Sequence, residues 1–234
     1  MSVTKRIINK NTLNKTNVGN TIISFTLMII GSLVMLYIGL KYIGSSDEIE
    51  RIYAMYAFVM VFFGLSGLFT ADYYDNRKIN IIPKIEDLNE FNTFLYLTAT
   101  LIMFIISAIA EAILVIKMRL ALSDTDFILY AVFAGVCEEA FFRKFLINMI
   151  IRLNTGYNEK PNVITLIIAL FVSSFAFMAI HLGVYGSDPI MLTSTLIGGF
   201  ILGIGYIVFR DISANISAHC LKNTIGVINL VRFG

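Results

Sequence analysis

The sequence predicts an all-α protein, a polytopic integral membrane helix bundle of about seven transmembrane helices. Of its 234 residues, 57% are hydrophobic and only 15% are charged, which leaves too few polar side chains to cover a soluble domain of this size. The apolar residues fall into runs of about 20, the length that crosses a bilayer as a helix. No basic cluster with interleaved aromatic residues indicates nucleic-acid binding. The apolar runs instead predict that the chain is embedded in a lipid bilayer.

Seven apolar runs follow one another with mostly short connections. The first run comes after a basic segment, residues 1–20, and is longer than the apolar part of a signal peptide, so we expect it to be retained. The polar stretch at 72–90 is the only sizeable loop, and no repeat or second domain is evident. The predicted spans are residues 21–43, 53–71, 91–116, 126–151, 162–185, 189–209 and 212–231.

The placement of Lys and Arg predicts a cytoplasmic amino terminus. With that orientation the inside segments hold ten Lys and Arg residues and the outside segments hold four. Cytoplasmic loops carry the excess of these residues in membrane proteins. Seven spans would then put the carboxy terminus at Gly234 outside. The expected location is a cell membrane or an endomembrane.

Small residues in the spans predict close helix packing. Gly199 and Gly203 form a small-x3-small pair in the sixth predicted span, which lets a neighbouring helix approach closely. Cys137 and Cys220 lie in apolar runs without the spacing of metal-binding cysteines. We expect them to be packing thiols, since a buried Cys behaves as a small hydrophobe.

The fourth predicted span carries four ionisable residues: Glu138, Glu139, Arg143 and Lys144. Each costs roughly 2.5–3.5 kcal/mol near the membrane centre, so charges at this depth indicate function. Glu139 and Arg143 are i,i+4 neighbours on a helix and can form an ion pair. Glu138 points away from Arg143 and needs a partner on another helix. Lys144 can extend toward the inner headgroups.

The chain has two histidines, His181 in the fifth predicted span and His219 in the seventh. His181 follows Phe177 by four residues, and His219 shares a helix face with Asn223. A single His in an apolar helix is usually a packing residue, but two of them with an unpaired Glu favour a shared site. The spans as drawn separate the two histidines by about 10 Å in depth. Tilted helices, or a fifth helix that continues past His181, would close that gap.

The pattern Glu-Glu-x3-Arg, then Phe-x3-His, then His-x3-Asn resembles the CPBP intramembrane proteases. These include the type II CAAX prenyl endopeptidases and the bacteriocin-processing or immunity-type Abi proteins. Each motif alone is weak, but all three in order form a strong signal. The resemblance implies a protease core at 91–234, preceded by accessory helices and a polar loop at 21–90 and by the cytoplasmic segment at 1–20. It also implies that Glu139 and Arg143 support the helix that carries the Glu-Glu-x3-Arg motif.

The same resemblance implies a hydrolase that cuts a peptide or protein substrate at the membrane, with prenylated substrates among the candidates. Glu138 would activate a water molecule with help from His181. His219 and Asn223 would stabilise the oxyanion, because peptide hydrolysis needs donors aimed at the developing negative charge.

Two catalytic types stay open. Glu138, His181 and His219 could supply the three ligands of a catalytic zinc, with water in the fourth position, as in a metalloprotease. These ligands would come from three helices, without the spacing that places two imidazoles on one helical face. The pairing of His219 with Asn223 also suits donation to an oxyanion. The sequence thus favours a glutamate-type enzyme with no obligatory cofactor, and zinc is the alternative.

Two other functions are compatible with these residues. Intramembrane Glu and His side chains serve as proton relays, which would suit a proton-coupled membrane carrier. Against a carrier, the chain shows no pair of broken helices in corresponding halves, a common feature of transporters. The other possibility is a catalytically silent immunity or scaffold protein of the same fold.

Overall fold

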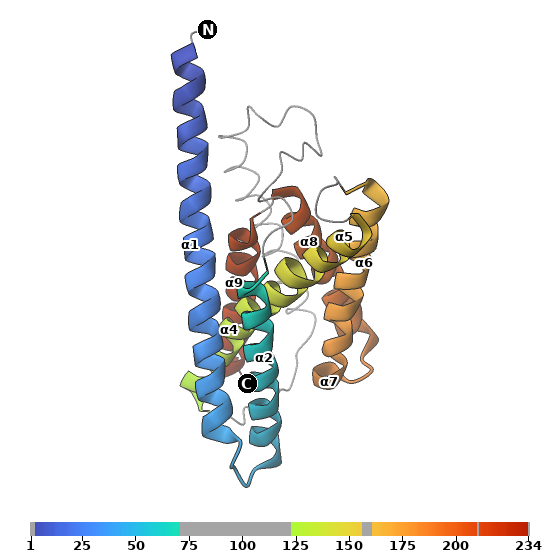
Figure 1. The fold of residues 1–234 in the computed structure, drawn as a ribbon. Helices are drawn as coiled ribbons and strands as arrows, with labels where there is room; N and C mark the ends of the chain where they lie inside the picture. Colours follow the sequence, from blue (N-terminus) through green and yellow to red (C-terminus); the bar gives the residue numbers. More distant parts are fainter. Residues whose placement is uncertain (1–2, 71–122, 156–160, 210, 234) are drawn as a thin grey trace.

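A computed structural model describes residues 3–70, 123–155, 161–209 and 211–233 of the chain. All regular elements in these ranges are helices (Figure 1), as the sequence predicts. The polar loop at 72–90 and the predicted third span at 91–116 lie outside the described residues. The helices are α1 (Val3–Tyr42), α2 (Glu48–Leu68), α4 (Asp124–Glu139), the π-helix η2 (Ala140–Ile147), α5 (Asn148–Thr155), α6 (Val163–Ile180), α7 (Leu182–Tyr185), α8 (Pro189–Phe209) and α9 (Ile212–Phe233).

Four of the described helices are long and apolar enough to cross a membrane: Ile22–Tyr42 of α1, and α2, α6 and α8. The predicted span at 126–151 is helical throughout, but it is divided among α4, η2 and α5. Helix α9 covers the predicted span at 212–231, but it is not one of these four helices. The total of seven spans remains a prediction.

Polar side chains set the starts of several helices. The Asp47 carboxylate accepts from the backbone N–H groups of Ile49 and Glu50 at the start of α2. Ser123 caps α4 in the same way, and Asn162 caps α6. Such caps satisfy N–H groups that have no partner inside the helix. The helix boundaries therefore follow from short polar segments between the apolar runs.

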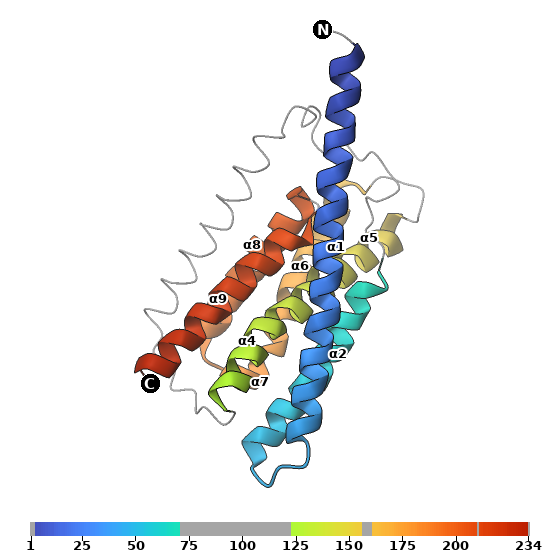
Figure 2. The same ribbon diagram turned by 90° about the vertical axis from the view of Figure 1, so that its left-hand side faces the viewer.

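Neighbouring helices α2 and α4 run in the same direction. Near the start of both helices, the rings of Tyr53 and Phe127 lie 6.2 Å apart. At the other end of α2, Gly67 lies against Ala140, which directly follows α4. Helices α6, α8 and α9 then alternate in direction, and the two ends of the chain lie at opposite ends of the bundle (Figures 1 and 2).

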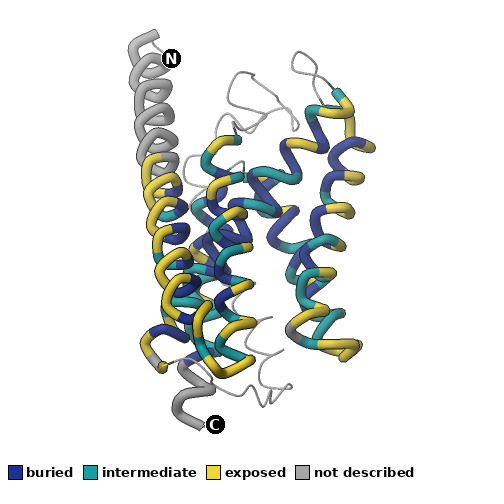
Figure 3. The backbone as a smooth tube through the Cα atoms, turned by 60° about the horizontal axis from the view of Figure 1, so that its bottom comes forward, coloured by how far each residue is buried: buried dark blue, intermediate teal, exposed yellow. Residues whose placement is uncertain are grey.

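The interior of the bundle is unusually polar, and its outer surface is apolar. Large apolar side chains such as Phe62 and Ile164 are more than 60% exposed on outward faces. Burial is concentrated where the helices face one another (Figure 3). Glu139, Arg143 and Ser173 are completely buried. This distribution suits a protein whose exterior contacts lipid and whose charged groups face the bundle interior.

Helix α4 and its continuation η2 carry the Glu-Glu-x3-Arg motif and are together called the motif helix. This helix is anchored to α1 at its first turn. The buried carboxylate of Asp126 accepts hydrogen bonds at one oxygen, Oδ2, from three donors. These are Lys41 Nζ at 2.6 Å, Tyr42 Oη at 2.5 Å and Ser123 Oγ at 2.8 Å. The anchor fixes where α4 begins relative to the end of α1.

The predicted small-x3-small contact is present between α8 and α6. A Cβ added at Gly199 would lie 3.3 Å from the backbone of Ser174, and one added at Gly203 would lie 2.5 Å from Leu170 Cδ1. Both cysteines are free, and Cys220 Sγ donates to the Val132 carbonyl at 3.2 Å. These contacts agree with the packing roles expected from the sequence.

Gly67 gives a direct test of how closely α2 and the motif helix pack. A Cβ at Gly67 would lie 2.6–2.9 Å from the Cβ, carbonyl oxygen and Cα of Ala140, so the backbone would have to move. We expect Gly67→Ala to lower the free energy of unfolding by about 1–3 kcal/mol. A lower thermal midpoint in detergent would show it. Gly198→Ala is the matched control, because a Cβ there meets nothing within 4 Å. Equal losses in the two variants would contradict the packing argument.

Candidate active site

The motif helix changes its winding directly after the two glutamates. Glu139 is the last residue of α4, and the chain continues as the π-helix η2 through Ile147. π-helical turns are rare and occur frequently at functional sites. The sequence prediction assumed α-helical geometry throughout, and no residue pattern indicated the change.

Glu139 is the buried centre of a polar cluster. Its Oε2 lies 3.3 Å from Arg143 Nε, which is the predicted i,i+4 ion pair. Its Oε1 lies 2.9 Å from Nδ1 of His219 on α9. Its Oε2 also accepts a hydrogen bond from Asn215 Nδ2 at 3.2 Å. Glu139 thus holds Arg143 and His219 in place at the same time.

Arg143 joins the motif helix to α6. Its Nη1 donates to Ser173 Oγ at 2.9 Å, and that hydroxyl donates to the Phe142 carbonyl at 2.7 Å. The guanidinium carbon also lies 5.0 Å from the centre of the Phe177 ring, within the range of a cation–π contact. Arg143 therefore orients Phe177 and, through it, the end of α6 that carries His181.

Glu138 has its partner on another helix, as its position in the sequence required. Its Oε2 lies 3.4 Å from His219 Nε2, so the His219 ring lies between the two glutamates. Glu138 and His219 are 7% and 4% exposed. Glu139 and Arg143 compensate each other in charge, so one proton shared by Glu138 and His219 makes these four side chains neutral overall. Neutrality matters because an uncompensated buried charge is very unfavourable.

His181 lies at the end of α6, where it is the C-cap residue, and the short helix α7 follows it. The predicted span at 162–185 is therefore interrupted at His181. Its Nδ1 lies 2.8 Å from the Phe177 carbonyl oxygen. The centre of the Phe177 ring lies 4.7 Å from that of His181 and 5.8 Å from that of His219. The Phe177 ring therefore lies near both histidine rings.

Asn223 and His219 make different contacts, although they share a face of α9. Asn223 Nδ2 donates to the Ala131 carbonyl at 2.8 Å, one turn of α4 away from Gly135. A Cβ at Gly135 would lie 3.4 Å from both Asn223 Nδ2 and His219 Cγ, so this glycine lets α9 approach α4. The structure therefore brings His219 to the glutamates and Asn223 to the adjacent backbone.

Asn215 also belongs to the site, although it was not among the predicted site residues. Its Nδ2 donates to Glu139 Oε2 and also, at 2.6 Å, to the Leu202 carbonyl. A sequence signal exists, because Asn215, His219 and Asn223 recur at intervals of four residues and so share one helix face. The longer pattern Asn-x3-His-x3-Asn would have identified it.

The prediction that Lys144 extends toward the headgroups is wrong. Lys144 is 7% exposed and lies on the buried face of η2 together with Arg143. The wider π-helical turn rotates less per residue than an α-helix, so two adjacent residues can both face inward. Asn148, one turn further on, donates to Tyr206 Oη of α8 at 2.7 Å. These buried polar residues extend the interior network toward α8.

The three residues considered as zinc ligands do not form a ligand set as they are placed. Both ring nitrogens of His219 face glutamate oxygens, and His181 Nδ1 faces a backbone carbonyl. Within the described ranges, no three His, Cys, Asp or Glu side chains are positioned to hold a metal ion. A zinc bound by Glu138, His181 and His219 would require these side chains to rearrange.

The comparison with protein families agrees with this geometry. Residues 120–225 match the family described as type II CAAX prenyl endopeptidase Rce1-like. Comparisons with curated proteins and with solved structures gave no match. The matched range includes α4 with Asp126, and it contains all the residues of the polar cluster. Residues 120–225, which hold all three motifs, are therefore similar to the Rce1-like type II CAAX prenyl endopeptidase family.

Proposed function

We propose that the chain is an intramembrane endopeptidase in which Glu138 is the general base. The observation that carries this proposal is the contact between Glu138 and His219 inside a cluster whose other charges are paired. The family is one of proteases, which supports hydrolysis of a peptide bond. Its description also supports a substrate whose carboxy-terminal segment is prenylated, and we adopt that substrate class for the tests below.

The position of one proton allows Glu138 and His219 to act together. Glu139 accepts from His219 Nδ1–H, so Nε2 carries a hydrogen only when the imidazole is doubly protonated. In that state Glu138 is an ionised carboxylate and can accept a proton from water. The same state gives His219 an Nε2–H that can donate to the oxyanion. With Glu138 ionised and His219 doubly protonated, Glu138 can act as the base and His219 as the oxyanion donor.

The reaction then follows from these roles. Glu138, assisted by His181, takes a proton from water as the oxygen attacks the substrate carbonyl carbon. His219 turns its Nε2–H from Glu138 to the carbonyl oxygen, and the second hydrogen of the Asn223 amide supports it. When the C–N bond breaks, Glu138 returns the proton to the leaving amine. No step in this scheme requires a metal ion.

Cleavage of a farnesylated peptide by the purified full-length protein tests the proposal. We expect a single cleavage site, detected by mass spectrometry, with activity that persists after chelation. Elemental analysis of the active protein is the complementary measurement. Stoichiometric zinc that is lost and regained together with activity would overturn the glutamate-type mechanism. A folded protein that cleaves no such peptide would favour the silent-scaffold alternative.

We also propose seven spans with the amino terminus inside. The parallel pair α2 and α4 supports this, because a connection between parallel neighbours has to return along the bundle, as a span at 91–116 would. The opposite positions of the chain ends agree with an odd number of spans.

Reporter fusions test this topology. Fusions at Gly234 and within residues 72–90 should report opposite sides of the membrane, with the 72–90 fusion on the cytoplasmic side. The same side for both positions would contradict seven spans.

A further inference from the structure

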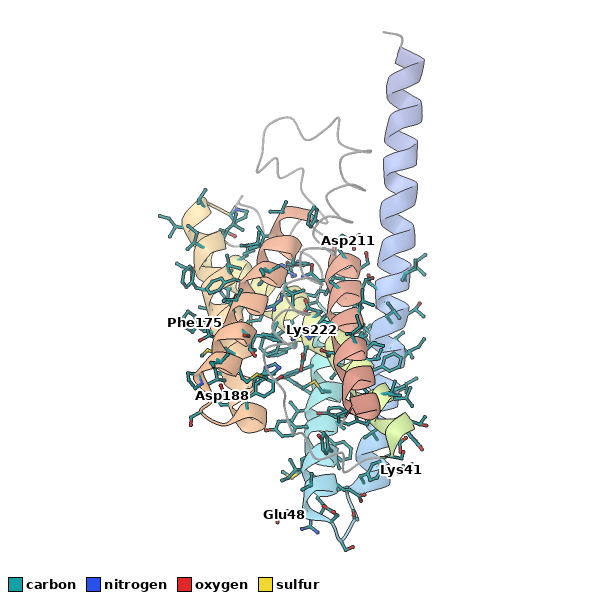
Figure 4. All side chains as sticks on the ribbon, turned by 180° about the vertical axis from the view of Figure 1, so that it is seen from behind. Lys41, Glu48, Phe175, Asp188, Asp211 and Lys222 are labelled. Carbon is teal, nitrogen blue, oxygen red and sulfur yellow. The ribbon has the colours of Figure 1, made fainter. Side chains whose placement is uncertain are left out.

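Lys222 is a cation in the middle of α9 that the catalytic scheme does not use. It is ten residues from Ile212 and eleven from Phe233, which places it about 15 Å from either end of the helix. Figure 4 shows Lys222 in the middle part of the bundle, away from both ends. Its side chain is half-buried. A lysine at this depth is unfavourable in a membrane protein and indicates a function.

Among the described residues, two other cations have carboxylate partners, and Lys222 has none. Lys41 is paired with Asp126, and Arg143 is paired with Glu139. Within the part of the chain that the structure describes, Lys222 makes no ion pair or hydrogen bond. Lysine has three N–H donors and no acceptor, so an anionic group is the complement that it lacks.

Lys222 lies next to the proposed active site along α9. It follows His219 by three residues, so the two side chains are neighbours on α9. It is also within electrostatic range of His181, which belongs to α6 on the other side of the site. An anion bound by Lys222 would therefore lie beside both histidines.

We propose that Lys222 binds the carboxy-terminal carboxylate of the peptide substrate. This inference rests on the proposed function, and it names the group that positions the substrate. Lys222 is about 4.5 Å from His219 along the helix axis, and an extended peptide spans roughly 3.3–3.6 Å per residue. A carboxylate held by Lys222 thus places a bond only a few residues from the free carboxy terminus at Glu138. Lys222 makes the enzyme selective for bonds near a free chain end.

Two farnesylated peptides that differ only at the carboxy terminus test this role. One ends in a free carboxylate and the other in a carboxamide. We expect the wild-type protein to cleave the acid with a kcat/KM roughly 10- to 100-fold higher than the amide, the range of a hydrogen bond to a charged group. The difference should appear mainly in KM. In Lys222→Gln the ratio should fall to about 1, and in Lys222→Arg, which keeps the charge, most of it should return.

The other possible results distinguish a failure of the role of Lys222 from a failure of the protease proposal. A wild-type protein that cleaves acid and amide equally, or a Lys222→Gln protein in which both rates fall in the same proportion, would overturn the role of Lys222 and leave the protease proposal intact. If neither peptide is cleaved, the protease proposal fails. Fluorescence anisotropy with labelled acid and amide peptides then decides the role of Lys222. A preference for the acid that Lys222→Gln removes supports it, and equal binding contradicts it.

Discussion

Glu138→Gln is expected to lower kcat/KM for peptide cleavage by about 10²- to 10⁴-fold, the usual contribution of a general base. Glutamine keeps the size of the side chain but cannot accept a proton from water. The neighbouring ion pair of Glu139 and Arg143 is unchanged by the substitution. The variant should therefore insert into the membrane and keep nearly the thermal midpoint of the wild-type protein.

Glu48→Gln is the matched control for this experiment. Glu48 is exposed at the start of α2, far from the site (Figure 4). This variant should cleave peptides at the wild-type rate. A folded Glu138→Gln protein with full activity would refute the assignment of Glu138 as the base.

Glu139→Gln is expected to lower the free energy of unfolding by about 3–5 kcal/mol, the range for removing one partner of a buried ion pair. The loss follows because Arg143 is completely buried and would lose its ion-pair partner. His219 would also lose the acceptor at its Nδ1, so activity should fall as well. Denaturant unfolding in detergent, followed by circular dichroism, measures the change in stability.

A double variant separates the charge from the shape of the side chains. Replacing both partners of a buried pair with neutral residues is often far less harmful than removing one. Glu139→Gln combined with Arg143→Met should therefore be more stable than Glu139→Gln alone. A double variant that is less stable than both single variants would show that the pair contributes through other contacts, such as the one between Arg143 and Ser173.

Periodicity and charge were enough to predict the helical class and the local pairs. The ion pair of Glu139 and Arg143 follows from helix geometry alone, since both residues belong to one helix. The need of Glu138 for a partner on another helix follows from the cost of an isolated charge in a membrane. The contact at Gly199 follows from the small size of glycine. Each of these inferences depends on a rule that holds within a few residues.

Contacts between distant helices could not be predicted in the same way. That His219 contacts both glutamates depends on how α9 crosses α4, which the sequence does not state directly. The inward position of Lys144 depends on the π-helix, and the helix rules assume α geometry. Asn215 taken alone has too many possible roles in an apolar span to indicate a contact, and only its spacing of four residues from His219 points to the site.

The π-helix η2 imposes a constraint on length rather than on residue type. It sets the rotational phase between two halves of one continuous helix. The first half presents Glu139 to α9, and the second half presents Asn148 to Tyr206 of α8. Removing one residue between them would change that rotational phase, so only one of the two contacts could survive. In this segment, substitutions can be absorbed one side chain at a time, whereas an insertion or a deletion would separate the active site from the helix that supports it.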